Sequence, residues 1–242
     1  DAPPPHEDPR PFVAVAEYLA SVGLTAPEIL GRDLDKGLLL LADFGDCRLR
    51  ETLDTDPARE RELYELATDL LVHLHRHRPM DGLRPHGVEQ WLEELSLFPD
   101  WYCPAVGLRP DVEAYRRAWI EVLRPVEEDG LGPVTVLRDF HAENLMLVGN
   151  REGVAHFGLL DFQDAVAGHP AYDLVSVLED ARRDVPPALE RAMIDRYVQA
   201  TGAGPGSSST SPSLTARCSG STSARRPRRW PRWLAATATS AA

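Results

Sequence analysis

The chain has 242 residues, 43% of them hydrophobic, which is enough apolar side-chain volume to bury a substantial core and excludes wholesale disorder. Its formal net charge is −12, and every acidic residue lies before position 203, so the body of the chain is strongly acidic. An acidic body argues against the phosphate backbone of a nucleic acid as partner and is compatible with neutral or cationic small molecules.

The first part of the chain begins at Asp1 and a run of prolines, which is typical of a connection inside a longer protein, so we expect a truncation or an internal boundary here. The segment from Pro11 to Val22 predicts a helix, because its apolar residues recur at helical spacing and Gly23 can end it. Two short strands are expected at Ala26 to Leu30 and Gly37 to Ala42, around a polar turn.

The middle of the chain has the pattern of helices. A long amphipathic helix is expected from about Pro57 to His77, closed by Pro79. Further helices are predicted at Glu89 to Leu97 and at Asp111 to Leu123. A break rich in glycine and proline at 130–133 then ends this helical region.

Apolar runs that bracket polar loops follow the break. They are Val134 to Leu137, Leu145 to Val148 and Phe157 to Leu160, and we expect them to be strands that present loop residues. Helices return at Ala171 to Arg182 and at Pro187 to Thr201. Helical and strand segments together predict an α+β fold.

The segment 203–242 departs from this pattern, because periodicity is lost, acidic residues stop, and six arginines occur. It is either a disordered basic tail or the product of a reading-frame change in a GC-rich gene. Its aromatic residues are confined to Trp230 and Trp233, so we expect no nucleic-acid partner.

Targeting signals and membrane segments are not found in the sequence. No apolar run approaches the roughly 20 residues that span a bilayer, and no signal-peptide pattern stands at the start, so we expect no membrane partner. The three cysteines are an odd number at wide spacing, which favours reduced thiols and a cytoplasmic protein.

Three polar side chains near the strand ends carry the chemical prediction. Asp139 and Asn144 stand five residues apart on one polar loop, and Asp161 follows another apolar run. Phosphoryl transfer from ATP needs a carboxylate that accepts the proton of the acceptor hydroxyl, and hard oxygen ligands for Mg²⁺. We therefore expect Asp139 as the catalytic base and Asn144 and Asp161 as magnesium ligands; the alternative is a set of capped turns in an ordinary α/β domain.

The segments 136–145 and 159–164 resemble the catalytic and metal loops of the aminoglycoside phosphotransferase and choline kinase branch of the protein-kinase-like fold. The resemblance places Asp139, Asn144 and Asp161 on the base and metal positions. It also implies that Asp173 supports the catalytic loop from the next helix, together with Arg138. One departure is that Leu137 replaces the histidine usual in the family, for which we expect a change in loop packing and no loss of chemistry.

The stretch 1–202 is most similar to one subgroup, the anomeric kinases of N-acetylmuramate and N-acetylglucosamine. This resemblance implies transfer of the γ-phosphate of ATP to the anomeric hydroxyl of an amino sugar in cell-wall recycling, and a possible adjacent or fused P-loop ATPase domain. The similar segments are Asp1 to Pro4 with Glu7 and Asp8, Leu97 to Tyr102, Asp161 to Ala165, and Tyr172 to Ser176.

The resemblance also implies two lobes: a partial N-lobe and hinge at 1–45 and a mainly helical C-lobe at 46–202, followed by the basic tail at 203–242. Asp43-Phe44-Gly45 spells the metal triplet of kinases but precedes the catalytic aspartate, so we expect Leu41, Ala42, Asp43 and Phe44 to form the nucleotide hinge instead. The chain has one lysine, Lys36, in a turn, and no glycine-rich loop before it, so the first N-lobe strands are expected to be absent and nucleotide binding to be poor.

Substrate contacts are expected from five further residues. His141 and Glu143 lie inside the catalytic loop, where sugar or phosphate contact and loop stabilisation are both open. Gln163 and Asp164 belong to the similar segment after Asp161. Trp101 can stack on a sugar ring or fill a core position.

Two other features of the sequence give weaker signals of a functional site. Glu17 on the first helix is either the partner of the missing cation or part of a solvated helix face. His73 and His77 share a helix face, as i and i+4 residues do, but no third metal ligand is evident and no metal site is expected there.

Competing functions are an aminoglycoside or other amino-alcohol kinase, which the acidic body would suit, and a catalytically inactive kinase-like fragment.

Overall fold

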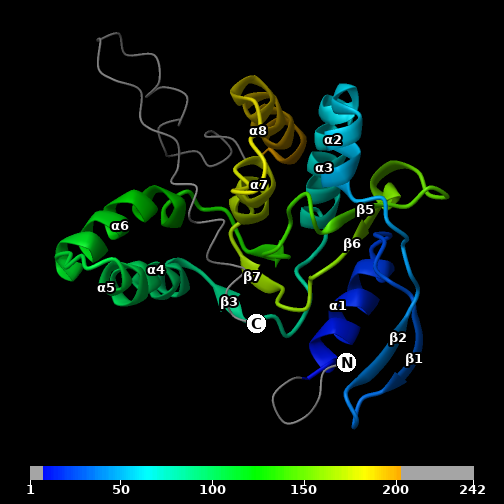
Figure 1. The fold of residues 1–242 in the computed structure, drawn as a ribbon, viewed down its shortest axis with the longest axis horizontal. Helices are drawn as coiled ribbons and strands as arrows, with labels where there is room; N and C mark the ends of the chain where they lie inside the picture. Colours follow the sequence, from blue (N-terminus) through cyan, green and yellow to red (C-terminus); the bar gives the residue numbers. More distant parts are fainter. Residues whose placement is uncertain (1–7, 203–242) are drawn as a thin grey trace.

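The computed structural model describes residues 8–202, which form an α+β fold of short strands and longer helices (Figure 1). The expectations for Asp1 to Glu7 and for 203–242 lie outside these residues. Within 8–202, no helix combines the length and the apolar character that a membrane span requires.

The first helix and a β-hairpin lie together at one end of the molecule (Figure 1). Helix α1 (Arg10–Ser21) agrees with the sequence prediction within one residue at each end. Strand β1 (Ile29–Asp33) pairs antiparallel with β2 (Leu38–Leu41). The first strand was predicted three residues too early. Just before the predicted start, buried Thr25 bridges to Gly158 in a different sheet and so does not belong to the hairpin.

Helices build the centre of the fold. They are α2 (Leu49–Thr55), η1 (Pro57–Arg59), α3 (Glu60–His75), α7 (Ala171–Leu178) and α8 (Pro187–Thr201). Helix α3 is buried on most of its circumference and packs against α8. Apolar residues from α1, α2, α3, α7 and α8 share one core with those of the central strands.

One helix was missed by the sequence prediction, and another ends earlier than predicted. Helix α2 was not predicted, because its seven residues are too few to show a clear period, yet it buries Leu49 and Leu53 completely. Helix α7 ends at Leu178 and does not reach Arg182, because buried Asp180 accepts hydrogen bonds from the backbone and the guanidinium of Arg182 and forms a turn there.

Short strands carry the polar loops. Strand β4 (Val134–Val136) pairs antiparallel with β7 (Val166–Gly168), which also pairs in parallel with β3 (Pro85–His86). Strand β5 (Leu145–Leu147) pairs antiparallel with β6 (Phe157–Leu159), after the short helix η3 (Gly153–His156). Strands β4, β5 and β6 were predicted to within one residue. Strand β3 was missed because it has only two residues, and β7 because its sequence, Val-Ala-Gly, is not a run of large apolar residues.

A helical arm, residues 88–127, extends to the left of the central helices in Figure 1. It consists of α4 (Val88–Leu97), the π-helical turn η2 (Phe98–Tyr102), α5 (Cys103–Ala105) and α6 (Val112–Glu127). Helix α6 continues four residues past the predicted end, through Pro125, and its last turn is kept by a hydrogen bond from Glu128 N to Arg124 O.

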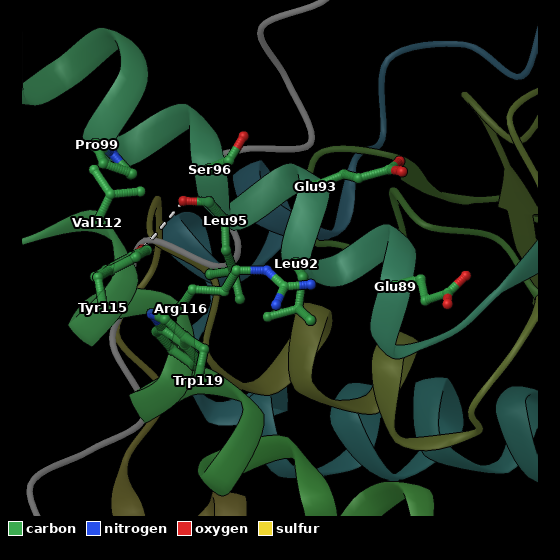
Figure 2. Close-up of a pocket in the computed structure, with 10 residues that line it drawn as sticks. All are labelled: Glu89, Leu92, Glu93, Leu95, Ser96, Pro99, Val112, Tyr115, Arg116 and Trp119. Carbon is green, nitrogen blue, oxygen red and sulfur yellow. Dashed lines mark hydrogen bonds between the residues drawn. The ribbon is translucent and has the colours of Figure 1, made fainter.

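The arm has a small core of its own. Leu95 of α4 and Trp119 and Leu123 of α6 are buried against each other, apart from the main core. A groove of about 350 Å³ runs between the two helices, with Tyr115 donating a hydrogen bond to Leu95 O across it (Figure 2).

Candidate active site

The catalytic loop, residues 137–144, joins β4 to β5 in a series of tight turns. Asp139 N donates to Leu137 O over 2.9 Å, and Asn144 N donates to His141 O over 2.9 Å. Arg138 has a φ of 70°, in the left-handed region, which costs a residue with a side chain about 1–2 kcal/mol. Such a conformation persists only where the surroundings fix it.

Asp173, in the first turn of α7, fixes this backbone. Its carboxylate is fully buried and accepts hydrogen bonds from Leu137 N at 2.7 Å and Arg138 N at 3.0 Å. Burial raises its pKa to about 7, and the two N–H donors act in the opposite direction by favouring the ionised form. The residue that the resemblance assigned to loop support therefore contacts the loop at its strained position.

The three residues expected to carry the chemistry lie together. Asn144 Nδ2 donates to Asp139 O at 3.0 Å and lies 3.5 Å from Asp161 Oδ2. Because the amide nitrogen makes both contacts, the amide oxygen is the atom of Asn144 that can ligate a cation. Described residues contain no group of three or more His, Cys, Asp or Glu that could hold a metal, but Mg²⁺ beside phosphates is commonly bound by only one or two protein carboxylates.

The metal loop after β6 is held from two sides. Asp161 adopts a left-handed φ of 57°, and Gln163 Nε2 donates to its Oδ1 at 2.7 Å. The next residue, Phe162, is completely buried and stacks on Phe12 of α1, with ring centroids 4.8 Å apart. Helix α1 thus packs against the residue that follows Asp161.

The carboxylate of Asp139 lies in a polar but poorly solvated position. The residue is 8% exposed, and its buried Oδ1 has no hydrogen-bond partner among the described residues. Burial raises its pKa to about 6, and the negative charges of Asp161 and Asp164 add to this, whereas Arg138 and Arg182 act against it. A base with this pKa is ionised at neutral pH and can still accept a proton readily.

His141 and Glu143 are engaged in contacts within the protein. Glu143 forms ion pairs with Arg50 of α2 and, at 3.3 Å, with Arg182 after α7. His141 is buried, and its Nε2 lies 3.3 Å from Asn144 Nδ2. Of the two roles left open by the sequence, loop stabilisation is the one that these contacts support.

The other predicted substrate residues are spread over two regions. Asp164 is exposed and near enough to Asp139 to raise its pKa. Trp101 lies in the arm and is 75% exposed, so the alternative of a core tryptophan was wrong. The structure thus places Gln163 and Asp164 near Asp161 and Asp139, and Trp101 on a different element.

The predicted hinge follows β2 in an extended segment. Ala42 N donates to Glu28 O at 2.8 Å, and Asp43 Oδ1 accepts from Gly45 N at 2.8 Å. The Phe44 ring packs on Gly158 of β6 so closely that a Cβ there would lie 2.5 Å from a ring carbon. Leu41 ends β2, so the hinge connects the hairpin to the strand pair behind the catalytic loop.

Lys36, the single lysine of the chain, and Glu17, the candidate partner of a phosphate-binding lysine, are both solvent-exposed. Lys36 lies in the turn between β1 and β2, as predicted, and pairs with Asp33 at 2.9 Å. Glu17 pairs with Arg32 at 3.1 Å, and its side chain is 64% exposed, which fits the solvated helix face.

The remaining sequence features have structural contacts. Leu137, in the place of the usual histidine, is 2% exposed and joins the main core, as expected for a packing change. His73 Nε2 lies 2.6 Å from Val22 O, and His75 Nδ1 lies 2.7 Å from the Tyr197 hydroxyl. These contacts give His73 and His75 of α3 partners within the protein.

Sequence reasoning missed the side chains that brace the loop from a distance. Arg50, Arg182 and Glu94 contact Glu143 or Arg138, and each comes from an element remote in sequence. No spacing rule relates such residues to the loop.

Comparison with protein families matches residues 1–208 to a family described as the phosphotransferase enzyme family. Among curated proteins, N-acetylmuramate/N-acetylglucosamine kinase of Caulobacter vibrioides is 39% identical over 204 residues, covering 78% of this chain and 54% of that protein. The protein of the same name from Pseudomonas aeruginosa is 38% identical over 200 residues, covering 81% and 57%. The chain thus spans about half the length of the curated relatives it matches.

Solved structures of similar fold include choline kinase LicA from Streptococcus pneumoniae, with a TM-score of 0.58 and 13% identity, covering 86% of this chain and 65% of that one. The ADP-bound aminoglycoside phosphotransferase APH(2'')-Ib has a TM-score of 0.56 and 18% identity, covering 81% and 70%. At such identities the likeness concerns the fold alone, and it confirms the protein-kinase-like α+β fold expected from the sequence.

Proposed function

Since this chain belongs to the phosphotransferase enzyme family, we propose that it transfers the γ-phosphoryl group of ATP to the anomeric hydroxyl of an amino sugar, N-acetylmuramate or N-acetylglucosamine. The observation that carries the proposal is the convergence of Asp139, Asn144 and Asp161 on one loop pair, with contacts of 3.0 and 3.5 Å through the Asn144 amide. Asp139 Oδ1 is buried without a hydrogen-bond partner among the described residues, and in this proposal it is the atom that meets the substrate hydroxyl.

In this proposal Asp139 orients the acceptor hydroxyl and accepts its proton as the oxygen attacks the γ-phosphorus in line. Mg²⁺ would be held by Asn144 Oδ1 and the Asp161 carboxylate, where it would neutralise negative charge on the phosphate oxygens. Gln163 keeps the Asp161 carboxylate in one orientation. Asp173 keeps the base in place through the loop backbone.

For the nucleotide we propose that the segment Leu41 to Phe44 holds the adenine through backbone groups, between a partial N-lobe at 1–45 and a C-lobe at 46–202. Its position between the hairpin and the catalytic strands supports this. Lys36 is engaged with Asp33 in an exposed turn, so residues 8–202 offer no lysine to grip the phosphates. We therefore expect weak binding of Mg-ATP by this chain.

The acceptor class rests on the curated relatives, which are 38–39% identical over about 200 residues. The names of the aminoglycoside and choline kinases carry less weight for the acceptor, because their identity to this chain is only 13–18%.

The proposal is tested by measuring ADP release with N-acetylmuramate, N-acetylglucosamine, choline and an aminoglycoside as acceptors. Amino sugars should give turnover, and Asp139→Asn should lower kcat by about 10²–10⁴-fold. The control is Asp81→Asn, which changes an exposed aspartate paired with Arg78 and should leave kcat unchanged. Turnover with choline or the aminoglycoside alone would overturn the acceptor class.

Calorimetry with Mg-ADP gives a second test that does not need turnover. If the chain gives a heat of binding with Mg-ADP and the Asp161→Ala variant does not, the result supports Asp161 as part of the nucleotide site. No binding and no turnover at millimolar nucleotide would instead identify a catalytically inactive fragment.

A further inference from the structure

An ion pair joins the arm to the catalytic loop. Glu94 of α4 accepts a hydrogen bond from Arg138 Nη2 through its Oε1 at 3.0 Å. We propose that Glu94 is a positioning residue: by fixing the Arg138 side chain it holds Asp139 in its reactive orientation and couples the arm to the catalytic base. This inference rests on the proposed function in taking Asp139 as that base.

The pair is substantially removed from solvent. The side chains of Arg138 and Glu94 are 20% and 26% exposed, and Arg138 Nε is buried without a hydrogen-bond partner. The guanidinium also interacts with the Tyr172 hydroxyl, and Glu94 is the carboxylate that pairs with it. A buried charge that loses its ionic partner is strongly destabilised, so removing the Glu94 charge should release the Arg138 side chain. His86 Nε2 lies 3.7 Å from Glu94 Oε1, but burial lowers the pKa of His86 to about 4, so it is neutral at pH 7 and supplies no competing charge.

The backbone of Arg138 is held from the opposite side. Asp173 accepts from Arg138 N at 3.0 Å, and Ser176 Oγ donates to Arg138 O at 3.3 Å, both from α7. The left-handed backbone of Arg138 is thus clamped by α7, and its side chain is clamped by α4. Asp139 is the next residue, so any relaxation of Arg138 rotates the peptide group that sets the direction of the Asp139 carboxylate.

The arm can change its orientation more easily than the core can, because it has its own small core. Glu94 contacts the loop, while its neighbours Glu93 and Leu95 line the groove between α4 and α6 (Figure 2). Helix α4 therefore carries the groove and the loop contact on adjacent residues. The geometry makes the position of the arm a determinant of kcat.

The test compares Glu94→Gln with the wild-type chain. Glutamine keeps the shape and removes the charge, and we expect kcat to fall about ten- to a hundredfold while KM for sugar and Mg-ATP stays within about twofold. Glu121→Gln, an exposed change on α6 of the same arm, is the matched control and should behave as wild type. An unchanged kcat, with or without a rise in KM, would overturn the proposal.

Hydrogen exchange provides a measurement that stands apart from activity. In Glu94→Gln the amides of 137–144 should exchange about tenfold faster while those of α3 and α8 are unchanged. Uniformly faster exchange would show a general loss of stability and would overturn a positioning role. Faster loop exchange in a chain without turnover would support the positioning role while the proposed function fails, so the two results are distinguishable.

A double-mutant cycle with Arg138→Met adds a check on the pair itself. If Glu94 acts through Arg138, the double variant should lose no more kcat than Arg138→Met alone. Additive losses would contradict action through Arg138.

Discussion

The catalytic loop and the arm are packed in contrasting ways. Within the loop, Leu137, Phe140 and Ala142 are at most 2% exposed and belong to the main core. The core of the arm has three buried residues. Of the eleven exposed large hydrophobic side chains in the described part of the chain, seven lie in the arm. They are Leu97, Trp101, Tyr102, Val106, Leu108, Val112 and Val122.

This difference matches what each region is proposed to do. The catalytic loop and the loop after β6 each keep one residue at positive φ, Arg138 and Asp161, and strained backbone of this kind requires a rigid surrounding structure. Regions with few buried contacts open at low free energy, and ligand-binding elements are often drawn from them. The fold thus separates a rigid part that fixes the reacting oxygens from a lightly anchored part joined to it by the Glu94–Arg138 pair.

The largest effect is expected from removing the support under the loop. Asp173→Ala leaves the N–H groups of Leu137 and Arg138 buried without acceptors, and we expect a loss of about 3–5 kcal/mol in the free energy of unfolding. Asp173→Asn keeps one acceptor oxygen and should lose less. Urea unfolding measures both, and a loss below about 1 kcal/mol for Asp173→Ala would show that the loop is not held in this way.

A second prediction concerns the cost of keeping Asp139 ionised. Its pKa is about 6 in the folded chain and 3.8 ordinarily, so the folded state binds this proton more tightly than the unfolded state does. The ionised carboxylate therefore destabilises the fold above pH 6, and this penalty disappears as pH falls below about 4. We expect Asp139→Asn to be more stable than wild type by about 3 kcal/mol at pH 8 and equal to it near pH 4.

Unfolding of both chains over this pH range measures the difference. Asp81→Asn, an exposed change, should show no such pH dependence and serves as the control. A variant that is less stable than wild type at pH 8 would mean that Asp139 is not desolvated in the folded protein.

The strands of the fold differ in how far the sequence could predict them. Strands β4, β5 and β6 were predicted correctly because apolar runs bracket polar loops. Asp139, Asn144, Asp161 and Asp173 were singled out because they match the spacing of a family motif, and their roles stay predictions. Strand β3 was missed because it has two residues and depends on pairing with β7 for its existence.

Side-chain pairing between distant segments was beyond the reach of sequence patterns. Glu94 and Arg138 are 44 residues apart, and Arg50 and Glu143 are 93 residues apart. Neither pair follows from helical or strand periodicity, because only the tertiary packing of α4 and α2 brings these side chains to the loop. The loop motif could therefore be recognised from the sequence, whereas the contacts that hold the loop in place could not.

The smallest effect on the body of the protein is expected from damage to the arm. Trp119 is one of the three buried core residues of the arm, and Trp119→Ala should speed hydrogen exchange in α4 and α6. Because this core is separate from the main one, the free energy of global unfolding should change by less than about 0.5 kcal/mol. Leu71→Ala, at a fully buried position of α3, is the comparison and should cost about 2–5 kcal/mol globally. If Trp119→Ala destabilises α3 and α8 as strongly as Leu71→Ala does, the arm and the body unfold as one unit, and the arm cannot move independently of the catalytic loop.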